Sequence, residues 1–436
     1  MSLTGWGRVP IADGREIRSE ELEVVTRAVP LTRGLGRAYG DAALPAAPDT
    51  VVAGSRLADR ILGFDETTGL LRAEAGFSLD HLYRVLLRRG WFTPVTPGTR
   101  FVTLGGMVAA DVHGKNHHRD GCIGEHVEAI TLRVADGQIL RCSRDSEPEL
   151  FRATIGGMGL TGHILEVSLR LVRVRSPWIL QQTERVPDID AFVDRLKEAA
   201  AVWPMTVGWI DSVARGGALG RGVLLCGRWA EPSEATDAFP ELRPMIDLSI
   251  DLPGGMLSTS LVRLMNAAYY HRFPAHKTQR LVSPESFLYP LDAIGSWNRG
   301  YGRRGFIQYQ CVLPEAGARG SVRQFMTLVA RHQRASFLSV IKDCGPEGTG
   351  MLSFPMPGIS IALDIPYDGV TQALVDEMNR LVIEHGGRIY LAKDALTRAD
   401  DFRAMEPRLD TFLAVRRFWD PDGKIRSAQS TRLFGW

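Results

Sequence analysis

The stretch that governs the fold of this chain is PVTPGTRFVTLGGMVAADVHGKNHH, residues 94–118. It joins a proline–glycine turn to a run of small apolar residues, and it contains three of the ten histidines: His113, His117 and His118. Glycine and small residues let another group approach the backbone, whereas histidines serve as bases or metal ligands. The stretch therefore predicts a ligand site, and its surroundings decide which kind.

Two further glycine clusters stand nearby, RGLGRAYGD (33–41) and IGGMGLTG (155–162). The first does not fit a Rossmann fingerprint, because its spacing is wrong and two prolines within the next ten residues prevent the helix that should follow. Its glycines still let backbone N–H groups reach a phosphate, and Arg33 and Arg37 add positive charge. Three such clusters favour a large cofactor held mainly by the backbone.

The histidines allow more than one reading. His113 and His117 could share a helix face as zinc ligands, but Gly114 disfavours a helix and no glutamate completes an H-E-x-x-H motif. His113 ends a buried segment, where it could act as a base or hydrogen-bond partner beside a cofactor. His117, His118 and His126 also fit loop histidines that bond to local carbonyls.

Composition limits the class of protein. With 436 residues, 44% hydrophobic and 23% charged, the chain fits two globular domains. A net charge of +2 gives no reason to expect nucleic acid, and five dispersed cysteines without a C-x-x-C pair indicate a reducing compartment. We expect no signal peptide and a cytoplasmic location. Peripheral contact with the inner membrane stays open, because the apolar, cationic segment 252–276 fits either a lipid-contacting loop or an ordinary packing helix.

Hydrophobic periodicity predicts an α+β chain. The expected helices are 78–90, 147–157, 188–203 and 369–387; the expected strands are 50–54, 69–76, 163–177, 221–229, 305–314, 336–345, 358–366 and 388–393. The later strands and helices suggest an antiparallel sheet covered by helices. The tail from Leu396 could close back on the first domain.

Several strands carry polar side chains suited to a sugar phosphate. A period of two places Gln308 and Gln310 on one strand face, as paired amides for hydroxyl groups. Lys342 and Lys393 each end an apolar strand, where two cations would suit an anionic, phosphate-bearing substrate. Trp209 and Tyr301 are either core aromatics or a stacking wall for the sugar.

Together these motifs resemble the flavin-dependent oxidoreductases of the vanillyl-alcohol-oxidase/PCMH superfamily, and within it the decaprenylphosphoryl-β-D-ribose 2-oxidases. The motifs that carry the resemblance are the glycine clusters, HGKNHH (113–118), LTGWGR (3–8), PLDAIGSWNRGYG (290–302), FIQYQ (306–310), LSFPMPG (352–358), YLAKD (390–394) and RLDTFLAVRR (408–417). HGKNHH is the most specific of them.

The resemblance implies an FAD domain over 1–176, an inserted antiparallel-sheet substrate domain over 177–387, and a segment 388–436 that completes the FAD domain. The residues it assigns to FAD are Arg33, Gly34, Leu35, Gly36, Arg37, Ala38, Tyr39, Gly40, Asp41, Gly98, Thr103, Gly105, Gly106, Ala110, Asp111, Val112, His113, Ile164 and Tyr390. Arg37 stands where covalent relatives carry a histidine, so the FAD is expected to be non-covalent.

The implied reaction is oxidation of the 2-hydroxyl of a polyprenyl-phosphoryl ribose to a keto sugar, the first half of an epimerisation in cell-wall arabinan synthesis. Lys393 and His113 are the catalytic candidates, with the choice of base open. A separate NADH-dependent short-chain reductase is the expected partner. The alternatives are an oxygen-using alditol or aldonolactone oxidase of the same superfamily, and a metal-dependent hydrolase built on the histidines.

The chain departs from its relatives on the substrate side. Ser360 and Ala362 stand where actinobacterial relatives typically carry Asn and Cys, so a thiol-directed covalent inhibitor of that family should fail here. The final residues, 422–436, also differ from the usual ending. These departures leave the flavin assignment intact and open the identity of the sugar and lipid.

Overall fold

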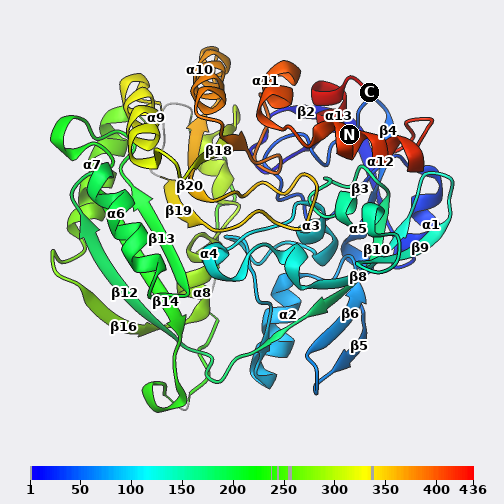
Figure 1. Cartoon of the computed structure of the whole chain (residues 1–436), viewed down its shortest axis with the longest axis horizontal. Helices are drawn as coiled ribbons and strands as arrows, with labels where there is room; N and C mark the ends of the chain where they lie inside the picture. The colour runs from blue at the N-terminus through cyan, green and yellow to red at the C-terminus, as the bar shows by residue number, and fades with distance from the viewer. Residues whose placement is uncertain (1, 237, 243–244, 254–257, 335–337) are drawn as a thin grey trace.

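The computed structural model describes residues 2–236, 238–242, 245–253, 258–334 and 338–436. The chain is α+β, as predicted. A large antiparallel sheet lies at one end and two smaller sheets lie at the other, near both termini (Figure 1).

The first part of the chain builds the two smaller sheets. The four-stranded sheet has the order β1 (Ser2–Thr4), β2 (Ile11–Arg18), β4 (Thr50–Gly54) and β3 (Thr32–Arg33). The five-stranded sheet has the order β5 (Ile61–Asp65), β6 (Leu70–Glu74), β10 (His163–Arg170), β8 (Val127–Arg133) and β9 (Ile139–Ser143). On β10 the alternation predicted from the sequence buries Leu165, Val167 and Leu169. Strands β7 (Trp91–Phe92) and β11 (Val172–Arg173) form a separate pair.

Short helices connect these strands. They are α1 (Leu22–Val25), α2 (Leu79–Leu86), α3 (Leu104–Ala109), α4 (His117–Asp120) and α5 (Pro148–Thr154). Helix α3 begins after Thr103, whose hydroxyl accepts the Gly106 N–H, as an N-cap residue does. Directly after α3, Asp111 takes a positive φ of 39°, and the chain turns there toward His113.

The large sheet is antiparallel at each of its pairings. Its order is β16 (Thr278–Val282), β12 (Ile179–Val186), β14 (Gly222–Trp229), β13 (Met205–Ile210), β19 (Ser339–Cys344), β20 (Gly358–Pro366), β18 (Phe306–Pro314) and β21 (Arg388–Ile389). Helix α6 (Ile189–Ala200) packs on β13 and β14, while α9 (Ala318–His332) and α10 (Thr371–Glu384) pack on β18 (Figure 1). These helices cover one face, and the other face is free to line a site.

Between these strands, α7 (Thr259–His271), α8 (Pro284–Leu288), β15 (Ile246–Asp247) and β17 (Ile294–Gly295) form an excursion beside the sheet. The sequence allowed either a lipid-contacting loop or a packing helix for segment 252–276, and the structure has helix α7 there. Residues 254–257 of this segment lie outside the described residues. Residues 336 and 337 of the predicted strand 336–345 do so as well. Among the described residues, no helix has the length and hydrophobicity needed to span a bilayer.

One predicted strand is wrong in extent. Strand β21 has only two residues, and Lys393 lies beyond it in a turn closed by the Lys393 N–H donating to the Tyr390 carbonyl at 2.9 Å. Lys393 is therefore positioned by a turn and not by the end of a strand.

The C-terminal helices are α11 (Ala399–Met405), α12 (Leu409–Trp419) and α13 (Ala428–Phe434). Helix α13 contacts the N-terminal glycine cluster, because Arg432 binds Asp41 and the Ala428 N–H donates to the Leu44 carbonyl. The division of the chain at residues 176 and 387 stays a prediction.

Candidate active site

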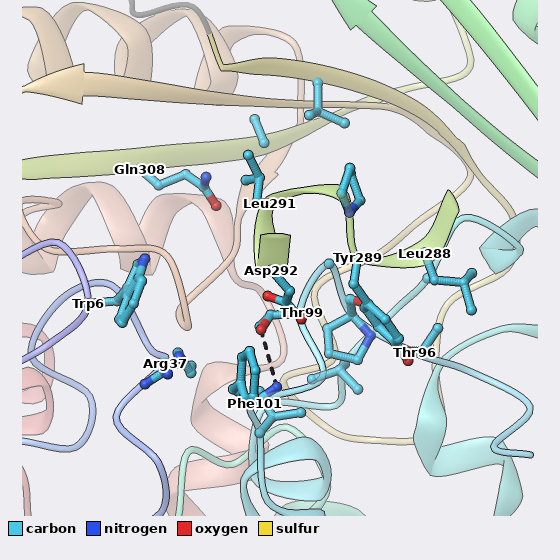
Figure 2. Close-up of a pocket in the computed structure, with 18 of the residues that line it drawn as sticks. Trp6, Arg37, Thr96, Thr99, Phe101, Leu288, Tyr289, Leu291, Asp292 and Gln308 are labelled. Atoms are coloured by element: carbon cyan, nitrogen blue, oxygen red, sulfur yellow. Dashed lines mark hydrogen bonds between the residues drawn. The ribbon is translucent and has the colours of Figure 1, made fainter. Parts of the chain in front are cut away.

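A cavity of about 1420 Å³ runs between the smaller sheets and the uncovered face of the large sheet. Small-molecule pockets usually measure about 300–1,000 Å³, so this cavity has room for more than one ligand. Figure 2 shows Trp6, Arg37 and Phe101 on one side of it, and Leu288 and Tyr289 on the other.

Most of the residues predicted for cofactor and substrate meet in this one cavity. They are Gly34, Leu35, Gly36, Arg37, Ala38, Tyr39, Gly98, Thr103, Gly105, Gly106, Ala110, Val112, His113, Ile164, Trp209, Gln308, Gln310, Lys342, Ala362, Tyr390 and Lys393. Segments nearly 360 residues apart in the sequence thus reach one site.

Five predicted residues are not among those that line it. Arg33 turns away, donating to the Thr4 and Ala43 carbonyls, and Asp41 pairs with Arg432. A Cβ on Gly40 would lie 2.0 Å from the Asp394 carbonyl oxygen, so this glycine permits backbone packing. Asp111 is held by the Gly124 N–H and the Ser353 hydroxyl, and Ser360 lies behind Gln310. These five support the site from behind.

The glycine-rich end of the cavity fits a dinucleotide. Among the described residues, the backbone N–H groups of residues 34–38 donate to no protein acceptor, so they are available to a phosphate. A Cβ on Gly34 would lie 2.6 Å from Thr103 Oγ1, and one on Gly105 would lie 2.9 Å from the Ala75 Cβ. Glycine at position 34 therefore lets its loop lie against Thr103, and glycine at position 105 lets the start of α3 lie against Ala75.

Arg37 adds the charge at this end. Its guanidinium lies 4.2 Å from the centre of the Trp6 ring and donates to the Leu35 carbonyl at 2.7 Å. Opposite it, Thr99 Oγ1 accepts the Phe101 N–H at 3.2 Å (Figure 2). Arg37 is thereby oriented beside the free N–H groups.

His113 lines the cavity away from its glycine-rich end and is almost fully buried. Its Nδ1 lies 2.9 Å from Lys342 Nζ and its Nε2 lies 3.2 Å from Gln310 Nε2. The Phe354 and Tyr390 rings pack against the imidazole, with centroids at 5.5 and 5.3 Å. Burial, with Lys342 and His117 adding to it, holds the pKa of His113 well below its usual value, so the ring is neutral at pH 7.

A neutral imidazole carries one proton, so only one of its nitrogens can accept. If Nδ1 accepts from the Lys342 ammonium, Nε2 is protonated and the Gln310 amide must present its oxygen to it. If Gln310 donates to Nε2, Nδ1 is protonated and Lys342 must be a neutral amine. The charge of Lys342 and the orientation of Gln310 are therefore linked through His113.

Three lysines reach the cavity, and burial lowers the pKa of each. The pKa of Lys393 falls to about 7, that of Lys342 to about 8 and that of Lys115 to about 7. Lys115 donates to the Leu288 carbonyl at 2.8 Å, whereas Lys393 Nζ lies 4.0 Å from the centre of the Tyr39 ring. Among the described residues, nothing accepts a hydrogen bond from Lys393 Nζ.

Comparison with known proteins decides the family. Residues 24–143 match the model of an FAD binding domain. Over 99% of this chain and 97% of the relative, the sequence is 34% identical to the decaprenylphosphoryl-β-D-ribose oxidase of Mycolicibacterium smegmatis. It is also 33% identical to an uncharacterized protein of Streptomyces coelicolor, over 82% of this chain and 99% of that protein. The D-arabinono-1,4-lactone oxidase of Yarrowia lipolytica is 29% identical over 35% of this chain and 30% of its own.

The chain belongs to the FAD-linked oxidoreductases of the VAO/PCMH type, which act on CH–OH groups. The predicted enzyme class and fold class are confirmed, and the metal-dependent hydrolase is wrong. Within the described residues, no three His, Cys, Asp or Glu side chains are arranged to hold a metal ion.

The remaining histidines of this oxidoreductase support the loop. His126 Nε2 lies 2.9 Å from the Asp120 carbonyl oxygen, so it bonds to a local carbonyl as expected. His118 Nε2 lies 2.9 Å from the Trp203 carbonyl oxygen, which is distant in the sequence and not local. His117 differs, because its Nδ1 accepts the Gly345 N–H at 3.0 Å.

The paired-amide prediction needs refinement. Gln308 donates to Asp364, its cross-strand neighbour, and also interacts with the Tyr39 hydroxyl. Asp364 is fully buried, which raises its pKa to about 7, and Tyr301 donates to it. Gln308 is thus engaged by the protein, while Gln310 is the amide that faces His113.

Sequence reasoning missed Asp364 and Asp292 as site residues. The sequence pattern could have indicated Asp364, because this residue continues the alternation of Ser360 and Ala362 along one strand. Asp292, which accepts the Arg100 N–H at 2.8 Å, lies in an irregular segment whose path no periodicity predicts.

Proposed function

We propose that this oxidoreductase oxidises the 2-hydroxyl of a polyprenyl-phosphoryl ribose, or a related glycosyl substrate, to the keto sugar as the first half of an epimerisation. The observation that carries the proposal is the meeting of Lys342, Lys393 and Lys115 with Gln310 around His113 in one cavity. Cations suit a phosphate and an amide suits sugar hydroxyls. The 34% identity to a decaprenylphosphoryl-ribose oxidase over nearly the whole length supports the same substrate class.

The cavity also has an apolar part that suits a prenyl chain. From His113 it continues along the sheet past Val207, Leu225 and Val340, and then past Met265 and Phe273. Trp209 lies in this part, with its ring 4.7 Å from that of Tyr269. Side chains of this kind favour a hydrocarbon substituent over water.

FAD would be held non-covalently, with the free N–H groups of residues 34–38 and Arg37 at its pyrophosphate and Ala110–His113 along its ring. Bound FAD supplies the acceptor for the hydride that leaves the carbinol carbon. Arg37 stands where covalent relatives carry a histidine, and an arginine forms no such bond.

Lys393 is the group best placed to take the hydroxyl proton. Its amine faces the cavity, no described protein group accepts a hydrogen bond from it, and its pKa of about 7 suits a general base at neutral pH. His113 has a pKa too low for an effective base. His113 and Gln310 then orient the sugar, and Lys342 holds the anionic group.

The keto sugar needs a hydride donor to complete the epimerisation, so a separate NADH-dependent short-chain reductase is the proposed partner. The second candidate is an oxygen-using aldonolactone oxidase, favoured by the 29% identity to the D-arabinono-1,4-lactone oxidase. That match covers about a third of each chain, whereas the match to the ribose oxidase is nearly complete.

Anaerobic bleaching of the flavin separates the two candidates. Short-chain prenyl-phosphoryl riboses should bleach it, and free pentoses and aldonolactones should not. Bleaching by aldonolactones alone, with hydrogen peroxide formed in air, would refute the proposal in favour of the second candidate.

A further inference from the structure

At its mouth the cavity is lined by side chains that are also exposed on the surface. Met245 and Asp247 of one segment, Met265 of α7 and Ile294 of β17 all line the cavity. Strands β15 and β17 pair there, with Ile246 opposite Ile294. Helix α7 lies at the end of the molecule away from both termini (Figure 1).

This mouth carries exposed apolar side chains, which we call the apolar rim: Met245, Ile246, Ile250, Leu261, Leu264, Met265 and Ile294. Ile246 is 74% exposed, and Ile250 and Leu264 are each 68% exposed. Isolated apolar residues on a surface are ordinary, but a group of them around one opening marks an interaction site.

Helix α7 leaves several of its apolar side chains exposed. Its buried residues are Val262 and Asn266, and Asn266 donates to Asp211 at 2.8 Å. Asp211 in turn binds Arg221 at 3.1 Å. A packing helix turns its apolar stripe inward, whereas α7 buries only Val262 and the polar Asn266 fully and leaves Leu264 exposed.

Cations outnumber carboxylates in this region, where the rim segment 245–251 carries Asp247 and Asp251. Residues 252–283 contain Arg263, Arg272, Lys277 and Arg280 and no Asp or Glu. Arg272 and Arg280 line the cavity and also an adjoining cavity of about 390 Å³. An apolar surface with cations beside it matches the acyl boundary and headgroups of an anionic bilayer.

We propose that the apolar rim docks this oxidoreductase on an anionic lipid bilayer, so that a lipid-linked substrate enters the cavity directly from the membrane. The inference rests on the proposed function. A second protein seated on the rim would close the opening, whereas a bilayer would supply the substrate through it.

Sedimentation of the FAD-loaded enzyme with vesicles tests the proposal. Binding to phosphatidylglycerol vesicles should exceed binding to phosphatidylcholine vesicles and should weaken with salt. The double variant Leu264→Glu/Ile246→Glu, whose residues lie outside the cavity lining, should bind at least about tenfold more weakly. Phe418→Glu is the matched control, because Phe418 is equally exposed but lies on α12.

A short-chain, water-soluble substrate separates this proposal from the proposed function. The double variant should bleach its flavin with that substrate as the wild type does. If the wild type binds vesicles but no prenyl-phosphoryl sugar bleaches it, the proposed function fails and the docking surface stands. Equal vesicle binding by the wild type and the double variant would overturn the docking surface. So would a wild type that binds no vesicles but forms a dimer, if the double variant is a monomer.

Discussion

The guanidinium of Arg432 donates to both carboxylate oxygens of Asp41, at 2.9 Å from Nε to Oδ2 and 2.7 Å from Nη2 to Oδ1. The same guanidinium donates to Asp394 at 2.8 Å. One residue of the C-terminal helix thus fixes the ends of two loops, those that carry Tyr39 and Lys393 into the cavity.

We expect Arg432→Ala to lower the free energy of unfolding by about 3–5 kcal/mol, because it leaves two buried carboxylates without a cation. Chemical denaturation of the enzyme measures this. Arg403→Ala is the control, since its pair with Asp410 is exposed and should contribute about 1 kcal/mol or less. Equal effects of the two substitutions would contradict the role given to Arg432.

Two of the three glycines in residues 98–106, Gly98 and Gly105, should respond differently to a methyl group. Gly105→Ala places a Cβ 2.9 Å from the Ala75 Cβ and should destabilise the apoprotein by about 1–3 kcal/mol. Gly98→Ala meets no described protein atom within 4 Å and should leave apoprotein stability unchanged. Thermal unfolding of the two apoproteins measures the difference, and a destabilised Gly98→Ala apoprotein would contradict it.

The sequence predicted the elements with regular periodicity and the residues that they carry. Gln308 and Gln310 share the expected face of β18, and Lys342 lies on β19 facing the cavity. A period of two is local, so it is visible in the chain. Which partner each amide takes depends on the neighbouring strand, where Asp364 accepts from Gln308 and Ser360 from Gln310 through a pairing that no local pattern reveals.

Irregular segments were less predictable. Lys393 is delivered by a turn and not by a strand, because β21 ends after Ile389. The glycine cluster at 33–41 predicted that its backbone faces a cofactor, but it could not say which of its residues line the cavity. Arg33 and Asp41 face away because Thr4 and Arg432, distant in sequence, satisfy their polar groups.

The rate of substrate-dependent flavin reduction should rise with pH through about 7. Burial lowers the pKa of Lys393 to about 7, and only the neutral amine, which predominates above that pH, can accept the hydroxyl proton. Lys393→Met should slow reduction by about 10²- to 10⁴-fold and abolish this acidic limb. Lys393→Arg keeps the cation and should lose the same limb. Stopped-flow reduction between pH 5.5 and 8 measures both, and a Lys393→Met enzyme that keeps the limb would exclude Lys393 as the base.

Lys342→Met should act on binding more than on chemistry. A charged hydrogen bond contributes about 1.5–3 kcal/mol, so KM for a phosphate-bearing substrate should rise about 10- to 150-fold. Steady-state kinetics should show a smaller change for an analogue without the phosphate. A loss confined to kcat, equal for both substrates, would instead place Lys342 in the chemical step.

Ala362 should explain resistance to thiol-directed inhibitors. It lines the cavity on β20, whereas the five cysteines are buried and none is among the described lining residues. We expect Ala362→Cys to gain one site for N-ethylmaleimide, detected by mass spectrometry and blocked by a bound substrate analogue. Labelling should be faster at pH 8.5 than at pH 7, because the thiolate is the nucleophile. Ala362→Ser is the control and should stay unlabelled. An Ala362→Cys enzyme that resists the reagent when folded but not when denatured would show that position 362 is closed to a ligand of that size.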